Sequence, residues 1–194
     1  MREYYTRDVV YHVRMMIDPA VGALLAGAYA LLFASAALYK LLDLERFAGV
    51  VRAYAVVPPA LARMSYLLPL LELTVAAGLL AAGSRRGAAA AGAGLLASYA
   101  AALAINLARG RRDLTCGCGG PNDRRPIATW MVWRNLALGA GLAAMLMRAG
   151  PRPMQVADAL TIGGGTAVLA LIYMSVDALL ARVVPRAAQW RSLS

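Results

Sequence analysis

The sequence predicts an all-α membrane protein: a polytopic helix bundle with a four-helix core, a fifth C-terminal span and a short amphipathic helix at the membrane interface. Of the 194 residues, 61% are hydrophobic, and the mean hydropathy of +0.60 is too high for a soluble domain of this size. Five stretches are long enough to cross a hydrocarbon core of roughly 30 Å at about 1.5 Å per residue. They are residues 19–39, 61–82, 88–108, 130–147 and 156–181, and with so little chain outside them, residues 1–194 are predicted to form a single domain.

Each of the first elements begins or ends at a recognisable residue. Pro19 begins the first span, because a proline in the first helical turn loses no hydrogen bond. Residues 42–57 follow with apolar side chains at helical spacing and charged side chains mostly on the other face. This is the pattern of an amphipathic helix lying at the membrane interface. Pro58 and Pro59 end that helix and lead into the second span.

The later connections indicate which spans are neighbours. The polar turn at residues 83–87 is so short that the second and third spans are predicted to be antiparallel neighbours. The third span is mostly Ala, Gly and Leu, a composition that allows close helix packing. Residues 110–129 form the longest polar connection, and residues 150–153 break the chain before the fifth span. Within that span, residues 163–165 are three glycines, which predict a local kink or a close contact.

The net charge of +10 comes from 20 Lys and Arg against 10 Asp and Glu. The basic residues cluster at the ends of the spans, where they bind lipid head groups and set the topology. We therefore expect membrane lipids, and not nucleic acid, to interact with these charges. The first 18 residues have three arginines and no apolar core before a small-residue cleavage site, so a removable signal peptide is not expected.

The only two cysteines of the chain, Cys116 and Cys118, are separated by Gly117 in the long polar loop. Residues i and i+2 of a bent chain can reach disulfide distance, and glycine permits the backbone angles that this requires. Such a bond is strained, and strain makes a disulfide labile and suited to exchange. A ring of three residues also removes little chain entropy, which argues against a stabilising role. Cys116 and Cys118 are therefore the predicted catalytic pair.

Four arginines flank the pair and are predicted to favour the thiolate that performs the exchange: Arg111, Arg112, Arg124 and Arg125. The alternative interpretation is that these arginines only mark a membrane boundary and that the cysteines are incidental. A structural zinc site needs four ligands, whereas the chain offers two cysteines and the distant His12. No metal site is therefore predicted within one chain.

Several polar residues lie inside or beside the spans. Glu72 is surrounded by leucines, where an unpaired carboxylate would cost at least about 2.5 kcal/mol. Lys40 is a candidate partner, and Arg63 is another. Lys40 and Glu72 are expected to converge with Arg134 and the cysteine loop at one end of the bundle. Four further residues are placed near the same end, and packing roles are favoured for the last two of them: Tyr54, Asn135, Asn106 and Asp177.

These residues carry a resemblance to a known family. The pattern resembles MauE, the methylamine utilisation membrane protein family, within the wider DoxX-like group. The resemblance covers roughly residues 20–147, and the combination of the first-to-second-span pattern with Cys-Gly-Cys is its most specific part. The matching residues are Lys40, Asp43, Phe47, Val51, Tyr54, Pro58, Pro69, Glu72, Cys116, Gly117, Cys118, Arg134, Asn135 and Leu136.

The resemblance implies a four-helix core similar to that of vitamin K epoxide reductase. It also implies a role in maturing the disulfide-rich small subunit of methylamine dehydrogenase, beside a periplasmic thioredoxin-like partner such as MauD. Cys116 and Cys118 would exchange electrons or a disulfide with that partner. Vitamin K epoxide reductase uses Cys-x-x-Cys near a quinone, whereas this chain has Cys-x-Cys and no second pair. A quinone is thus the one cofactor that the resemblance suggests, and a complete quinone relay in this chain is not predicted.

The orientation in the bacterial inner membrane rests on conflicting arguments. The side with the cysteine loop has 12 Lys and Arg and the opposite side 7, so the positive-inside rule places the loop in the cytoplasm. Disulfides persist outside the cytoplasm, and oxidative maturation needs the loop there. We favour the periplasmic side, because arginines near thiols also serve reactivity.

The sequence supports three functions. The first is a thiol–disulfide oxidoreductase component that works through Cys116 and Cys118, with Lys40 and Glu72 shaping the adjacent pocket. The second is a docking or assembly subunit that anchors a soluble partner through the amphipathic helix. The third is a transporter of a soft metal ion, since thiolates select such ions. The scattered methionines and single thiol pair argue against transport.

Overall fold

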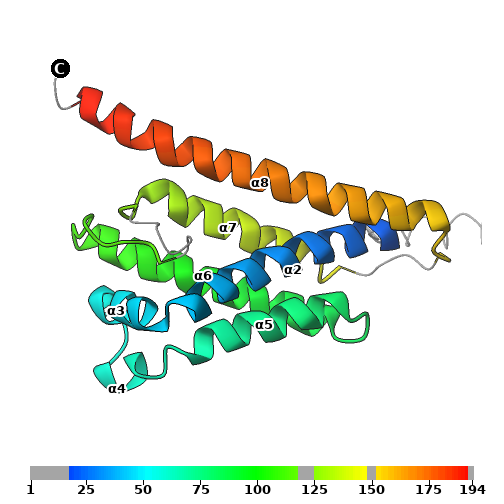
Figure 1. Cartoon of the computed structure of the whole chain (residues 1–194), viewed down its shortest axis with the longest axis horizontal. Helices are drawn as coiled ribbons and strands as arrows, with labels where there is room; N and C mark the ends of the chain where they lie inside the picture. The colour runs from blue at the N-terminus through cyan, green and yellow to red at the C-terminus, as the bar shows by residue number, and fades with distance from the viewer. Residues whose placement is uncertain (1–17, 118–124, 148–151, 192–194) are drawn as a thin grey trace, which may run out of the picture.

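The computed structural model describes residues 18–117, 125–147 and 152–191, with side chains described as far as residue 180. Five helices run side by side in an elongated bundle (Figure 1), and two short helices lie at one of its ends. The long elements are α2 (Pro19–Leu42), α5 (Leu67–Leu80), α6 (Arg85–Ala108), α7 (Thr129–Ala144) and α8 (Val156–Arg191), and the short ones are α3 (Leu44–Tyr54) and α4 (Pro59–Ala62). Helix α2 packs on α5 and α8, and α6 packs on α5 and α7.

The bundle is a polytopic all-α membrane protein, as the sequence predicts. In the described part of the chain, α2, α6 and residues Val156–Leu180 of α8 are long and apolar enough to cross a membrane. Large apolar side chains remain exposed along these helices, including Leu31, Leu171 and Ile172. An apolar outer surface is what a bundle surrounded by lipid requires.

The predicted second span, residues 61–82, is divided in the structure. Helix α4 ends at Ala62, and hydrogen bonds from Met64 to Leu61 and from Leu67 to Met64 form tight turns before α5 begins. Helix α5 has 14 residues and α7 has 16, so each covers less than the roughly 30 Å hydrocarbon core at about 1.5 Å per residue. The predicted span at 130–147 is likewise continuous only over Thr129–Ala144.

Small residues allow the close packing of the bundle core. Phe33 of α2, Leu79 of α5 and Leu142 of α7 are almost completely buried in one apolar cluster. A Cβ atom placed on Gly92 of α6 would lie 3.1 Å from the Phe33 ring and 3.0 Å from Leu142, so the glycine leaves the space that these side chains fill. The core therefore lies between α2, α5, α6 and α7.

Helix α8 is held against α2 by the glycine-rich segment of the fifth span. Gly165 leaves no room for a side chain beside Leu24, and the hydroxyl of Thr166 donates to the Leu24 carbonyl at 3.2 Å. Helix α8 is continuous from residue 156 to 191, and Gly165 marks the close contact, whereas a Cβ atom on Gly163 or Gly164 would meet nothing within 4 Å.

Arg152 joins the start of α8 to the start of α2. Its guanidinium donates to Asp18, which caps α2, at 2.7 Å and to Asp158 in the first turn of α8 at 2.8 Å. Hydrogen bonds from Arg152 and from the Ala20 N–H hold the pKa of Asp18 below its usual value. This cluster fixes the entry of α8 relative to α2, far from the cysteine loop (Figure 1).

Candidate functional site

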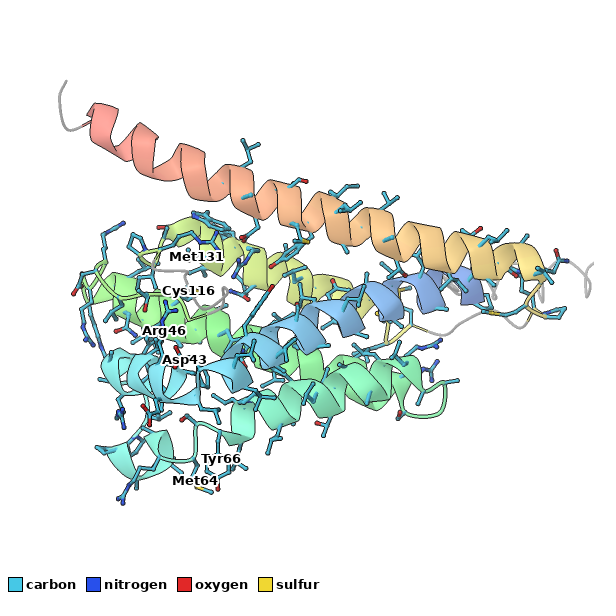
Figure 2. The ribbon with its side chains drawn as sticks, viewed as in Figure 1. Asp43, Arg46, Met64, Tyr66, Cys116 and Met131 are labelled. Carbon is cyan, nitrogen blue, oxygen red and sulfur yellow. The ribbon has the colours of Figure 1, made fainter. Side chains whose placement is uncertain are left out.

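The candidate site lies where α2 ends, α6 ends and α7 begins. Figure 2 shows Cys116 and Met131 at this end of the bundle, together with Arg46 of α3 and Asp43, which directly precedes α3. Asp43 caps α3, since its side chain accepts a hydrogen bond from the Arg46 N–H at 3.1 Å. Of the predicted pair, Cys116 is described, whereas Cys118 and the predicted thiolate-stabilising Arg124 lie outside the described residues.

Cys116 lies at the start of a narrow loop whose two limbs pair. Thr115 forms an antiparallel bridge with Pro126. On either side of this bridge, Cys116 N–H donates to the Arg125 carbonyl at 3.4 Å and Ile127 N–H donates to the Leu114 carbonyl at 2.8 Å. The bridge gives the cysteine backbone a defined position in an otherwise irregular segment.

The Cys116 side chain is half-buried and packs against a small apolar cluster. This cluster contains the buried residues Tyr54, Leu103, Ile127 and Met131. The Tyr54 hydroxyl also donates to the Cys116 carbonyl at 3.4 Å, so α3 contacts the loop directly. An apolar surface along one side of a thiol limits the solvent that reaches it.

Gly117 has the backbone conformation that the sequence suggested. Its φ angle is +68°, in the left-handed region that glycine adopts without strain. A Cβ atom at this position would lie 3.0 Å from Val50 of α3. Any other residue between the cysteines would therefore be strained in the backbone and crowded against α3.

The flanking arginines have structural partners. Arg111 donates to the Ala53 carbonyl at 2.7 Å and to the Asn106 side chain at 3.2 Å. Together with Arg109, which donates to the Ala55 carbonyl at 3.2 Å, it caps the C-terminus of α3. Arg112 is exposed. The predicted stabilisation of a thiolate by Arg111, Arg112 and Arg125 remains a prediction.

Arg125 and Arg134 share one carboxylate. Arg125 Nη1 lies 2.9 Å from Asp177 Oδ2, and Arg134 Nη1 lies 2.6 Å from Asp177 Oδ1. The Arg134 guanidinium also stacks over the Trp130 ring at 5.3 Å. Asp177 thus lies at the end of the bundle that carries Cys116, as expected for a fifth helix that crosses completely.

Lys40, one of the two candidate partners, forms a salt bridge with Glu72 inside the bundle. Their side chains are only 5% and 1% exposed. Tyr99 of α6 donates from its hydroxyl to the same Glu72 oxygen at 2.8 Å, and the Lys40 ammonium lies 5.0 Å from the centre of the Tyr99 ring. The ammonium also faces Phe47 of α3 at 5.5 Å, so this cluster joins α2, α3, α5 and α6.

Two buried amides complete the polar set. Asn135 donates to the Met131 carbonyl at 2.8 Å and Asn106 to the Ala102 carbonyl at 3.0 Å, each one turn back along its own helix. Both amides therefore stabilise helices at the site. This agrees with the packing role expected for Asn106.

A groove of about 340 Å³ separates α3 from the first limb of the cysteine loop. Arg46, Val50 and Tyr54 line it on the α3 side, and Asp113, Leu114 and Thr115 line it on the loop side. The groove lies one residue from Cys116 and is open to solvent or head groups. It provides a surface on which a partner segment could approach the thiol.

Sequence reasoning missed two contributors. Tyr99 is seven residues before Asn106 on the same buried face of α6, and a tyrosine within an alanine-rich span was the available signal for a buried hydrogen bond. The link between Arg125 and Asp177 joins residues 52 positions apart, and nothing local in the sequence indicated it.

Together these features define a class: a polytopic α-helical membrane protein with a thiol loop at one end and a buried ion pair beneath it. The family model described as "Methylamine utilisation protein MauE" matches residues 18–148. The chain belongs to this family of methylamine utilisation proteins.

Individual relatives agree with the family assignment. The methylamine utilization protein MauE of Paracoccus denitrificans is 40% identical over 168 residues, which are 84% of this chain and 89% of the relative. The protein of the same name from Methylophilus methylotrophus is 36% identical over 170 residues, 84% of this chain and 87% of the relative. The one from Methylorubrum extorquens is 36% identical over 160 residues, 80% of this chain and 86% of the relative. No solved structure matches the chain.

Proposed function

We propose that this chain is a thiol–disulfide exchange protein of the bacterial inner membrane that acts in methylamine utilisation through Cys116 and Cys118. Its exchange partner is a periplasmic thioredoxin-like protein, and the client is a disulfide-rich protein such as the small subunit of methylamine dehydrogenase. In each exchange a thiolate attacks a disulfide sulfur and forms a mixed disulfide, which the second thiolate resolves. The dithiol loses two electrons and two protons, and the disulfide gains them.

The observation that carries this proposal is the placement of Cys116. The bridged base of the loop holds its backbone, the neighbouring Gly117 has a φ of +68°, and its side chain is half-buried at the end of the bundle. A reactive thiol needs a fixed backbone, access for a partner and a flexible neighbour that lets the second cysteine approach. A cysteine kept only for packing requires none of these.

A second candidate function is that of a membrane docking subunit, and the groove between α3 and the loop favours it. Arg46, Val50 and Tyr54 present a mixed polar and apolar surface there. In that case the thiols are dispensable, and the charges on α3 hold the partner. The two functions therefore predict opposite results for the same variants.

The test uses growth on methylamine of a strain whose own copy of this gene is replaced by variants. We expect Cys116→Ser and Cys118→Ser to abolish growth, while Thr115→Ser, a matched change in the same loop, supports it. The amount of each variant in the membrane is measured in parallel, so that loss of the protein is not mistaken for loss of chemistry. Normal growth of Cys116→Ser, together with loss of growth in Arg46→Glu, would replace exchange by docking.

A further inference from the structure

Asp177 is the point at which α8 contacts the cysteine loop. Its two carboxylate oxygens bind different arginines, Arg125 of the loop at 2.9 Å and Arg134 of α7 at 2.6 Å. Asp177 and Arg134 are 17% and 15% exposed and Arg125 is 31% exposed, so both pairs are partly shielded from solvent. One carboxylate of α8 therefore pairs with cations on two other elements.

Arg125 connects this ion pair to the thiol. Its backbone carbonyl accepts the hydrogen bond from Cys116 N–H, and the next residue, Pro126, forms the bridge with Thr115. The limb that Asp177 holds by its arginine is thus the limb that pairs with Cys116. Because the two limbs are paired, the contact of Asp177 with Arg125 on one limb also fixes the position of Cys116 on the other limb.

Arg134 makes the arrangement rigid on the side of α7. It stacks over Trp130 while it binds Asp177, and Trp130 lies in the first turn of α7, directly after the loop. The carboxylate is therefore held in place by α7 when it binds Arg125. A carboxylate that is already oriented loses little entropy when it binds a second guanidinium.

We infer that Asp177 is a positioning residue that tethers the cysteine loop to α8 and restrains the exposure and reactivity of Cys116. The family model ends at residue 148, so the tether comes from a helix outside the part of the chain that the model matches. The role of this tether in exchange rests on the proposed function. The effect of the tether on the position of the loop does not depend on that function.

The test measures alkylation of Cys116 by a maleimide in the purified full-length chain in detergent. A Cys118→Ser background leaves Cys116 as the only thiol, since the chain has two cysteines. We expect Asp177→Asn to raise the alkylation rate about fivefold, the effect of losing partly exposed ion pairs. The cause is that the loop limb opens more often and the charge of Arg125 is no longer neutralised by the carboxylate.

Three further variants make the result specific. Arg125→Gln removes the loop end of the tether but keeps the pair between Asp177 and Arg134, so it tests the tether even if Asp177→Asn fails to fold; it should raise the rate less than Asp177→Asn does, because it frees the loop limb but also removes the charge of Arg125. Asp177→Glu keeps the charge and should return the rate toward that of the parent. Asp158→Asn, which breaks an ion pair of α8 at the opposite end of the bundle, should leave the rate unchanged.

Parental alkylation rates in both Asp177→Asn and Arg125→Gln would overturn the tether. Faster alkylation in Asp158→Asn equal to that in Asp177→Asn would overturn it as well, because any loosening of α8 would then suffice. The proposed function fails separately: if Cys116→Ser supports growth on methylamine while Asp177→Asn still accelerates alkylation, exchange is excluded and the tether stands.

Discussion

At the scale of single residues, the buried charges of this bundle are paired, although Glu72 Oε2 is buried without a hydrogen-bond partner among the described residues. Glu72 is 1% exposed and receives both the Lys40 ammonium and, at 2.8 Å, the Tyr99 hydroxyl on one carboxylate oxygen. Phe47 and Tyr99 place their rings near the same ammonium. Removing one partner of a buried ion pair leaves an uncompensated buried charge, which is strongly destabilising. Lys40 and Glu72 therefore depend on each other.

This dependence gives a prediction for Lys40→Met. The substitution leaves the Glu72 carboxylate in an apolar surrounding with Tyr99 as its remaining donor, so we expect a loss of about 3–5 kcal/mol in the free energy of unfolding. Thermal unfolding in detergent measures the loss. The double variant Lys40→Met with Glu72→Gln should recover most of it, because Tyr99 can still donate to the amide oxygen while no charge is buried.

Arg152→Met provides the matched control, since Arg152 is also a cation shared between helices but is 37% exposed. Its loss should lower the unfolding temperature much less, because exposed ion pairs contribute little. An equal effect of the two substitutions, or no recovery in the double variant, would show that burial does not set the energetics of the Lys40–Glu72 pair.

At the scale of helices, much of the architecture was predictable from the chain. Apolar runs, Pro19 and the Pro58-Pro59 pair located the spans and the amphipathic helix. A buried carboxylate demanded a nearby cation, for which Lys40 and Arg63 were the candidates. The pattern did not show that residues 63–66 form tight turns, because their side chains are as compatible with a helix as those of α5. Pairing that depends on three-dimensional packing, such as that of Asp177 with Arg125, has no local signature.

The glycines of α6 give a prediction at this scale. A Cβ atom on Gly92 would lie 3.0 Å from Leu142 and 3.1 Å from the Phe33 ring, closer than ordinary van der Waals contact, whereas a Cβ atom on Gly94 would meet nothing within 4 Å. We expect Gly92→Leu to lower the free energy of unfolding by about 1–3 kcal/mol or more through overpacking. Gly94→Leu should be tolerated, because its side chain enters lipid. Thermal unfolding of both proteins decides the point, and equal stability would show that α6 does not bury Gly92 in this packing.

At the scale of the whole molecule, the chemistry is concentrated at one end. The end of α2, all of α3 and the start of the cysteine loop lie there, while the turn between α5 and α6 lies at the other end (Figure 1). Asp177 of α8 belongs to the first end, because it binds Arg125 and Arg134. Helix α8 begins beside the start of α2 and runs to the other end of the bundle (Figure 1), so its C-terminal arginines fall on the side of the cysteine loop. The bias of 12 Lys and Arg against 7 therefore stands, and it opposes the periplasmic location that exchange requires.

Labelling intact cells with a membrane-impermeant maleimide resolves this opposition. We expect Cys116 and Cys118 to be labelled only after mild reduction, since disulfides persist outside the cytoplasm. A single cysteine at Gly83, introduced into a chain without Cys116 and Cys118, is the control for the opposite end, because Gly83 is exposed in the turn before α6. That cysteine should react only after lysis.

The reverse pattern, with Gly83→Cys labelled in intact cells and the native pair protected until lysis, would place the loop in the cytoplasm. The orientation would then agree with the positive-inside rule. The arginines around the loop would serve to set this orientation and to cap α3. A periplasmic thioredoxin-like partner could not reach Cys116 in that orientation. The docking function through α3 would then be the better account of this end of the molecule.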